Sequence, residues 1–417
     1  MNIFFDVNKW VILLFCVFIS SCSTQRNSKK NSLNPYGSIL FTLSPQFQIF
    51  HTSSDSSIIF AKLSSENLLP RIFQGKNILS ISVSGKLYDR YDKNLLLDTF
   101  KQTFNWQFEG SPYRFLEINV PFKSSGPKNQ VLELVINDIY KGKLNMFSLN
   151  VDRTKFNNQH VLPWGSAGEL RYSGFVEPNS EVFIETYGVN SERLWVNYYT
   201  PIFDVAPPPF IPPERIVKFE WKVDSNYAVR PSGRINIHKP GIYSVSQLAK
   251  TQYAFLYNFG SGFPLIIKDE DLLTPLKYIT TLEEYRIMKQ SPNLREAIDD
   301  YWMKVAGQNK EKALLILKVY YSRVQGANKH FSSYKPGWMT DKGMIYTIFG
   351  PPLKVSRKKN TEIWEYKKSY LSAPITFTFG LEPNPFSESH YVLDRLYSYK
   401  DIWYIQVDNI RNGYIIN

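Results

Sequence analysis

The stretch from Pro336 to Pro352 constrains the fold more than any other part of the sequence. Gly337 and Gly343 bracket a predicted turn. Within this turn, a side-chain oxygen of Thr340 or Asp341 can accept a hydrogen bond from a nearby backbone N–H group. We therefore expect the stretch to fold as a tightly hydrogen-bonded turn that organises the elements on either side of it.

The residues after this turn are bulky and β-prone, so Met344–Phe349 is predicted to be a strand. Gly350 permits an unusual φ, and Pro351 and Pro352 cannot donate to a ladder, so the strand should end there. A second β-prone run, Glu362–Tyr366, follows closely. We expect the two runs to pair.

This stretch resembles the GWxTD domain, a family of bacterial envelope proteins that is common in the Bacteroidetes. The residues that carry the resemblance are Gly337, Trp338, Thr340, Asp341, Gly343, Gly350, Pro352, Trp364 and Tyr366. Residues 323–328 and 411–413 also resemble the family. The resemblance covers about the final third of the chain. It implies a place in the cell envelope and names no reaction.

Residues 1–21 are predicted to be a lipoprotein signal peptide. The apolar run Trp10–Ile19 is too short to span a bilayer, because a transmembrane helix needs about 20 apolar residues. Ile19–Cys22 resembles a bacterial lipobox, which implies cleavage between Ser21 and Cys22 and acylation of Cys22. The alternative is an ordinary secretory signal that is cut nearby.

The residues after Cys22 bear on location. Ser23 stands where an aspartate often signals retention in the inner membrane, so the outer membrane is favoured. No acid occurs in residues 24–32, whereas exported surface lipoproteins usually carry acids there, so we expect the protein to face the periplasm. Residues 22–35 are mostly polar and are predicted to be a flexible tether. Cys16 leaves with the signal, so no thiol remains for a disulfide, a metal or catalysis.

The net charge of +12 predicts attraction to anionic headgroups or other polyanions, although it is equally consistent with solubility alone. No helix-turn-helix, zinc-finger or RNA-recognition signature is present, so nucleic acid is not an expected partner. The expected partners are the membrane, through the lipid, and another envelope protein.

Residues 36–156 and 157–268 read as two β-sandwich-like segments, because short β-prone runs alternate with Gly, Pro, Asn and Ser turns. The predicted strands are 38–43, 47–50, 57–63, 78–83, 104–108, 114–120, 130–136, 182–187, 193–199, 216–221 and 242–245. The Pro-rich loop 206–213 should be extended, since each proline fixes φ and lacks a donor. It is either a rigid crossover loop or a recognition segment for a partner.

Residues 269–417 are predicted to form an α+β domain. Thr281 and Glu284 make a capping box that starts one helix, and Asn293 starts a second. A third helix is expected over 310–331, and its predicted buried face is Leu314, Leu317, Tyr321, Val324 and Phe331. Strands are predicted over 375–380 and 391–393, and a last helix ends at 412–413. The whole chain is thus predicted to be mostly β, with a C-terminal helical hairpin and a small antiparallel sheet.

Candidate catalytic groups are few. The five histidines are scattered and show no metal-ligand spacing, so we expect no metal and no cofactor. Asp341, Glu362 and Glu365 could converge near Trp338 and Trp364, and paired acids beside aromatic rings suit glycan cleavage. The simpler interpretation is that Asp341 caps backbone N–H groups, that the two glutamates face opposite sides of a strand, and that both tryptophans anchor the core.

Two functions follow from these patterns. The favoured one is a non-enzymatic, lipid-anchored binding or scaffold protein of an envelope assembly or secretion process. A Gly-x-Pro turn followed by a Trp-x-Tyr strand is similar to the pattern of small lipoproteins of the outer-membrane barrel-assembly machinery. The alternative is a glycan- or peptidoglycan-active enzyme or binder that uses the three acids and two tryptophans named above.

Overall fold

The structure is a computed structural model, and it describes residues 45–89, 93, 95–110, 115–125, 129–200, 202–212, 222–247, 253–358, 360–367, 373–387 and 389–414. Contacts divide the chain into the units Met1–Leu33 and Asn34–Asn417, and every described residue belongs to the second. The signal peptide, Cys22, the tether and the predicted strands 38–43 and 216–221 lie outside the described residues. Among the described helices, none has both the length and the apolarity that crossing a bilayer requires.

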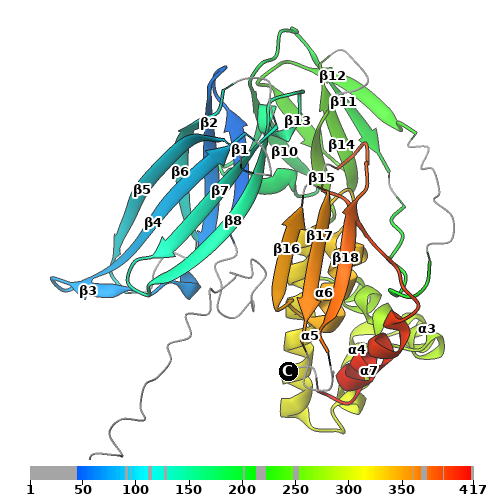
Figure 1. Ribbon diagram of the computed structural model, residues 1–417. Coiled ribbons are helices and arrows are strands. Elements are labelled where there is room, and N and C mark those ends of the chain that lie inside the picture. Colours follow the sequence, from blue (N-terminus) through cyan, green and yellow to red (C-terminus); the bar gives the residue numbers. More distant parts are fainter. Residues whose placement is uncertain are drawn as a thin grey trace, which may run out of the picture. The chain divides into compact units, whose positions relative to one another are not determined.

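The first β body consists of two antiparallel sheets around one hydrophobic core (Figure 1). One sheet has the order β1-β2-β6, with β1 (Gln46–His51), β2 (Ser56–Ser64) and β6 (Phe115–Lys123). The other has the order β3-β4-β7-β8, with β5 also paired to β4. Its strands are β3 (Arg71–Phe73), β4 (Lys76–Tyr88), β5 (Leu96–Phe108), β7 (Asn129–Asp138) and β8 (Lys143–Asp152). A short turn of helix, η1 (Ser65–Asn67), joins β2 to β3.

Side chains along β2 are alternately buried and half-buried, as expected for a strand with one face in a core. The predicted strands between residues 47 and 136 are confirmed. β8 is an additional strand that the sequence pattern did not reveal, because Asn145, Ser148 and Asn150 interrupt its run of apolar residues.

The second β body also has two antiparallel sheets. One has the order β13-β10-β9, with β9 (Val161–Gly165), β10 (Ser180–Thr186) and β13 (Arg234–Ile237). The other has the order β12-β11-β14-β15, with β11 (Leu194–Tyr199), β12 (Ser225–Val229), β14 (Gly241–Ser246) and β15 (Ala254–Asn258). Short helical turns occur at η2 (Asn158–His160) and η3 (Tyr172–Gly174). The described strands predicted here, over 182–187, 193–199 and 242–245, are confirmed.

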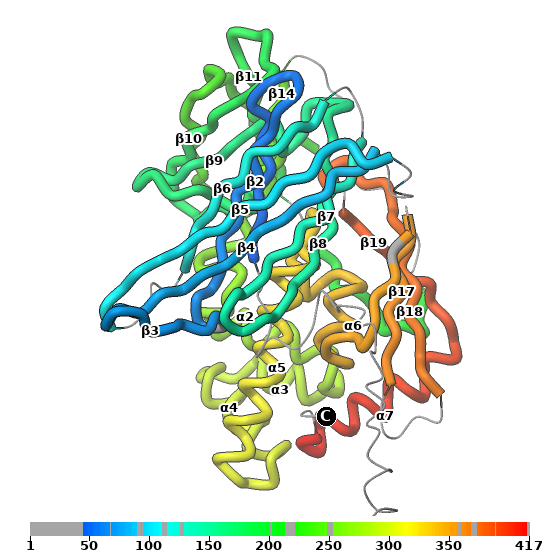
Figure 2. The backbone as a smooth tube through the Cα atoms, turned by 60° about the vertical axis from the view of Figure 1, so that its left-hand side comes forward, coloured from blue at the N-terminus to red at the C-terminus, as the bar shows by residue number. Residues whose placement is uncertain are grey.

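The C-terminal region is α+β. Its helical elements are α2 (Asp269–Leu273), η4 (Thr274–Tyr278), α3 (Leu282–Gln290), α4 (Leu294–Val305), α5 (Lys310–Phe331), η5 (Gly337–Met339), α6 (Asp341–Phe349) and α7 (Tyr399–Arg411). Its antiparallel sheet has the order β16-β17-β18-β19, formed by β16 (Lys354–Lys358), β17 (Thr361–Tyr366), β18 (Ile375–Leu381) and β19 (Tyr391–Leu393). Figures 1 and 2 show α6 beside this sheet. The predicted class, mostly β with a C-terminal α+β part, is confirmed.

The predicted helix starts hold. Thr281 Oγ1 accepts from Glu284 N at 3.2 Å and Glu284 Oε2 accepts from Thr281 N at 2.8 Å, which completes the capping box. Asn293 caps α4, and the last helix ends at Asn412.

The predicted buried face of α5 is partly wrong. Leu314 is 57 % exposed, and the residues actually buried include Ala313, Ile316 and Tyr320, each of which lies one position before a predicted residue.

The predicted strand Met344–Phe349 is wrong, because these residues belong to helix α6. Every residue of α6 is buried, so its sequence lacks the polar face that signals a helix, and its bulky residues resemble a strand. The helix begins where Thr340 caps it. The predicted pairing of Met344–Phe349 with Glu362–Tyr366 is therefore wrong as well. Glu362–Tyr366 does form a strand, β17, but its partners are β16 and β18.

The loop 206–213 is not extended throughout its described part, 206–212. Ile211 N donates to Pro208 O at 3.0 Å, which closes a turn. The loop packs against the C-terminal region of its own chain. Ala206 N donates to Met339 O at 3.0 Å, and the ring of Phe210 lies 5.5 Å from that of Tyr404. We call residues 202–212 the strap.

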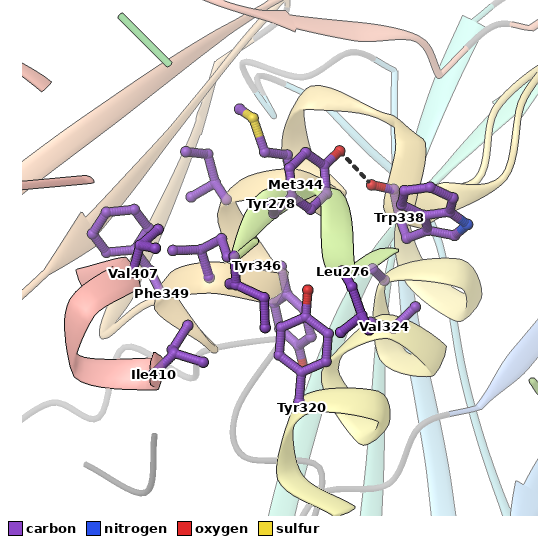
Figure 3. Close-up of a cluster of buried hydrophobic side chains, with 14 of the residues drawn as sticks. Leu276, Tyr278, Tyr320, Val324, Trp338, Met344, Tyr346, Phe349, Val407 and Ile410 are labelled. Atoms are coloured by element: carbon purple, nitrogen blue, oxygen red, sulfur yellow. Dashed lines mark hydrogen bonds between the residues drawn. The ribbon is translucent and has the colours of Figure 1, made fainter. Parts of the chain in front are cut away.

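The largest hydrophobic core lies in the C-terminal region and includes Ala206 of the strap (Figure 3). Figure 3 shows Tyr320 and Val324 of α5 facing Leu276 of η4 and Tyr346 of α6. The ring of Phe331 at the end of α5 is 5.3 Å from Tyr346 and 5.1 Å from Trp364 of β17. Helices and sheet therefore share one core, and Trp338, Trp364 and Tyr366 of the motif belong to it.

Candidate functional site

The two glycines of the motif allow three pieces of backbone to approach closely. A Cβ atom on Gly337 would lie 2.0 Å from Ala327 O of α5, and one on Gly343 would lie 1.8 Å from Gly337 O. Neither distance is possible for a real side chain, and both obstacles are backbone. Glycine is thus required for η5 to fit between α5 and α6.

Trp338 is buried, with 5 % of its surface exposed. Its backbone N–H donates to Asn328 Oδ1 at 3.2 Å, and its carbonyl accepts from the hydroxyl of Tyr278 at 3.0 Å (Figure 3). The indole meets the Tyr278 ring edge-on, with centroids 6.0 Å apart. Burial raises the pKa of Tyr278 well above its usual value, so this hydroxyl stays protonated and donates. Trp338 is therefore a core anchor.

Thr340 starts α6. Its hydroxyl accepts from Gly343 N at 3.0 Å and donates to Gly337 O at 2.7 Å. The first contact is an N-cap bond, and the second closes the preceding 3-10 turn. The predicted turn chemistry of this threonine is confirmed, although the element that it starts is a helix.

Asp341 forms a bidentate ion pair with Arg395. Its Oδ1 lies 2.6 Å from Nη2 and its Oδ2 lies 2.9 Å from Nη1, and the two side chains are 9 % and 6 % exposed. Oδ2 also accepts from Leu393 N at 2.7 Å. Asp341 does cap a backbone N–H as predicted, but that N–H belongs to β19. Arg395 in turn donates to Pro207 O of the strap at 3.0 Å.

Glu362 is also buried and paired. Its carboxylate lies 3.2 Å from Lys342 Nζ and accepts from Trp364 Nε1 at 2.5 Å. Lys342 Nζ further lies 3.5 Å from the centroid of the Tyr391 ring, a cation–π contact. These contacts join α6 to β17 and β19.

The predicted acids do not converge on a cleft. Glu362, Trp364 and Tyr366 are buried on one face of β17, while Glu365 lies on the opposite, half-buried face, as expected from its spacing. Trp364 has no exposed surface. Since glycan cleavage needs two accessible carboxyl groups, the geometry of these residues does not fit a glycosidase.

Further along the motif, Gly350 has φ 76° and ends helix α6, where the end of a strand was predicted. Its carbonyl accepts from the hydroxyl of Tyr366 at 2.9 Å. Beneath it, the buried Arg323 donates to Ile348 O at 3.1 Å, and burial lowers the pKa of Arg323 to about 10, which still leaves it charged. The Gly-x-Pro and Trp-x-Tyr signatures thus meet around one helix end.

Several residues of this network were not predicted. Arg395 and Lys342 pair with the two buried acids. Lys335 Nζ donates to Asp204 O of the strap at 2.9 Å. Burial, with Lys335 nearby, lowers the pKa of His390 to about 4. No local signal marks these residues, because each finds its partner only through the fold.

The histidines do not form a metal site. Among the described residues, no group of three or more His, Cys, Asp and Glu side chains could hold a metal ion. His51 instead bonds Ser57 Oγ at 2.8 Å and Asp152 O at 3.1 Å, and its ring lies 4.7 Å from that of His160.

A small cavity lies among residues that include Gln48, Asn158 and Phe255. It has a volume of about 10 Å³, which is room for about one water molecule.

Comparison with protein families identifies the C-terminal region. Residues 241–412 match the family model of the GWxTD domain. This chain carries a GWxTD domain. The match begins at β14 of the second β body and ends just after α7, so it contains both buried ion pairs, Asp341–Arg395 and Lys342–Glu362.

Two of the solved structures that match the GWxTD-domain chain show distant likenesses. The part that aligns with a calcium-binding mutant of Bacteroides uniformis beta-glucuronidase 2 covers 26 % of this chain and 13 % of that enzyme, at 11 % identity and a TM-score of 0.19. The part that aligns with red sea bream transglutaminase covers 52 % of this chain and 31 % of that protein, at 8 % identity and a TM-score of 0.19. Scores this low carry no argument about fold or function. Comparison with curated proteins finds no match.

Proposed function

We propose that this chain is a lipid-anchored envelope protein that binds other envelope components and does not catalyse a reaction. The proposal rests on the contacts that the polar side chains of the GWxTD motif make. Its threonine, its aspartate and its buried glutamate neighbour are all bonded to groups of the same chain. The motif therefore holds the domain and the strap together, and leaves binding to surfaces elsewhere.

The proposed location rests on the N-terminal sequence. Ile19–Cys22 resembles a lipobox, and the acid-free residues 24–32 favour the periplasmic face of the outer membrane. The resemblance to GWxTD proteins of the bacterial envelope supports a place in the envelope. In this proposal the two β bodies act as spacers or docking modules, and the partner belongs to an envelope assembly or secretion process.

The alternative of a glycan-active enzyme has no support in the geometry. A retaining or inverting hydrolase needs one carboxyl group that donates a proton and a second that reaches substrate or water. Asp341 and Glu362 each lie against a cation, in side chains that are at most 9 % exposed. Trp338 and Trp364 are buried and cannot stack on a sugar ring.

The anchor is tested by growth with labelled palmitate. Label should enter the wild-type chain and be absent from Cys22→Ala, and only the wild type should sediment with membranes after high-salt washing. Equal fractionation of the two proteins would remove the anchor from the proposal.

The binding role is tested by purification from detergent-solubilised envelope after cross-linking in cells. We expect outer-membrane barrel or secretion components with the wild type, and their loss with Cys22→Ala, which misplaces an otherwise unchanged body. Incubation of the purified chain with peptidoglycan should release no fragments. Release that Glu362→Gln abolishes would establish the enzyme instead.

A further inference from the structure

We propose that one end of the first β body inserts into a membrane surface that contains anionic phospholipids. The site consists of residues 69–76 and 139–144, which we call the tip. The inference rests on the lipid-anchored placement proposed above, and adds the part of the folded body that meets the lipid. Figures 1 and 2 show the β3–β4 and β7–β8 turns, which belong to the tip, at the same end of their sheet.

Five large apolar side chains of the tip face solvent. The exposed fractions are 47 % for Leu69, 73 % for Ile72, 58 % for Phe73, 40 % for Ile139 and 47 % for Leu144. Single exposed apolar residues are ordinary on a protein surface, but neighbouring ones form a patch of the kind that meets a partner or a membrane.

The first segment of the tip is a β-hairpin. Phe73 pairs with Lys76, and the two residues between them, Gln74 and Gly75, have φ values of 49° and 77°. Positive φ at both positions of a two-residue loop is the geometry of a type I′ hairpin, which matches the twist of its strands. Ile72 and Phe73 are therefore displayed on a hairpin and not on a loose loop.

A buried carboxylate holds the two segments of the tip together. Asp138, which is 3 % exposed, accepts from Leu69 N at 2.9 Å through one oxygen. Its other oxygen accepts from Tyr140 N at 3.2 Å and Lys141 N at 3.1 Å. Ile139 is thereby fixed beside the segment that leads into β3.

Basic residues surround the apolar patch. The two segments of the tip contain Arg71, Lys76, Lys141 and Lys143 and no acid. The guanidinium of Arg71 lies 5.9 Å from the Tyr140 ring, across the gap between the segments. Burial, and then the nearby charge of Lys141, lower the pKa of Lys143. The acid closest in the sequence is Asp138, which is buried and bonded to backbone N–H groups of both segments. The next acids in the sequence and the strand register are Glu66 on η1 and Glu109, which follows the partner of Asn77.

Cations around exposed apolar side chains complement a surface with anionic headgroups over hydrocarbon. A protein partner with an acidic, apolar face would be the other fit. The course of the chain favours the membrane. Gln46, at the start of β1, pairs with Lys62, close to the end of β2 that leads through η1 to the tip.

The described chain thus enters the first β body at the end that carries the tip. The segment 23–44, which would join this entry to an acylated Cys22, can span at most about 75 Å. A lipid anchor would therefore leave the tip within reach of the same surface.

The test uses vesicle sedimentation with a chain that starts at Ser23. It lacks the lipid but keeps the unit Asn34–Asn417. We expect at least tenfold tighter binding to vesicles of phosphatidylglycerol and phosphatidylethanolamine than to phosphatidylcholine alone, weakening as salt increases. Ile72→Ser with Phe73→Ser should weaken the binding about tenfold or more. Lys76→Glu with Lys141→Glu should weaken it and remove the salt dependence.

The matched control is Leu282→Ser with Ile287→Ser on α3, whose side chains are 87 % and 58 % exposed and lie outside the tip. It should bind vesicles like the unsubstituted chain. Equal binding by the tip variants and the control, or no preference for anionic vesicles, would overturn the proposal, as would tip-dependent self-association without vesicle binding. Palmitate labelling of the full chain tests the lipid anchor separately. The vesicle result for the tip and the labelling result for the anchor can therefore be judged independently.

Discussion

Asp341 and Arg395 are 54 positions apart in the sequence and form the central contact of the GWxTD domain. Because both side chains are buried, removing one partner leaves the other as an uncompensated charge in a poorly solvated site. The same guanidinium also bonds Pro207 O of the strap. The pair thus links α6, β19 and the strap.

Arg395→Ala should therefore lower the free energy of unfolding by about 3–5 kcal/mol, as measured by urea denaturation. Arg395→Lys should recover only part of the loss, since an ammonium cannot make the bidentate contact. Arg286→Ala is the control, because Arg286 and Glu283 are 56 % and 63 % exposed, and its effect should stay below about 1 kcal/mol. Similar losses for Arg395→Ala and Arg286→Ala would contradict the role given to the buried pair.

At the scale of residues, the lowered pKa values of His51 and His160 also predict that the stability of the protein depends on pH. Burial, assisted by Arg153, lowers the pKa of His51 to about 3 and that of His160 to about 4. In the unfolded chain both titrate near pH 6.5, so between these values the unfolded state binds more protons. Their contribution to stability is complete above about pH 6.5 and declines as the pH falls towards 4.

Urea midpoints between pH 8 and 4 should show this decline, and His160→Gln should make it shallower. His330 and His390, whose pKa values are also lowered to about 4 by burial, titrate equally in both proteins, so the difference reports His160 together with its effect on the neighbouring His51. Parallel curves for the two proteins would show that His160 is not responsible.

At the scale of elements, α5, η5 and α6 pack with their backbones in contact at the motif glycines. Gly343→Ala would place a Cβ atom 1.8 Å from Gly337 O and 2.6 Å from Gly337 C. Neither atom is at the end of a flexible side chain, so η5 or α6 must move and the contacts of Trp338 and Asp341 must move with it.

We expect Gly343→Ala to cost at least about 3 kcal/mol of stability, the upper end of the usual cost of overpacking. Gly380→Ala in β18 is the control, since its Cβ would meet nothing within 4 Å, and it should be neutral or slightly stabilising. Circular dichroism during denaturation measures both variants. A stable Gly343→Ala protein would show that the three elements tolerate a wider spacing.

At the scale of the whole molecule, the strap connects regions that are distant in sequence. Ala206 lies in the core of the C-terminal region, and Lys335 and Arg395 each donate to a carbonyl of the strap. The GWxTD family match begins at residue 241 and thus excludes a segment that the folded domain contacts.

Phe210→Ala removes the ring that lies against Tyr404 and should loosen the strap. Hydrogen exchange at Ala206, whose N–H donates to Met339 O, should become at least several-fold faster. Ile202→Ala, at a side chain that is 78 % exposed, should leave that exchange unchanged. Equal exchange in both variants would mean that the strap is held by its backbone contacts alone.

Much of the architecture follows from local sequence. Alternating apolar residues predict most described strands, because one face of each strand lies in a core, and Thr281 and Asn293 predict helix starts, because they can satisfy free N–H groups. The prediction failed at α6, where every side chain is buried and no periodicity remains. It also failed at Leu314, because the stripe of α5 was placed by spacing alone.

The sequence by itself determined the GWxTD motif, the glycines that its turns require and the caps of its helices, since these depend on neighbours along the chain. Only the tertiary structure decided what the motif's acids do. Asp341 finds Arg395, and Glu362 finds Lys342, across elements that are brought together by burial of the shared core. A carboxylate's role depends on its partner and its exposure to water, and both are properties of the folded chain.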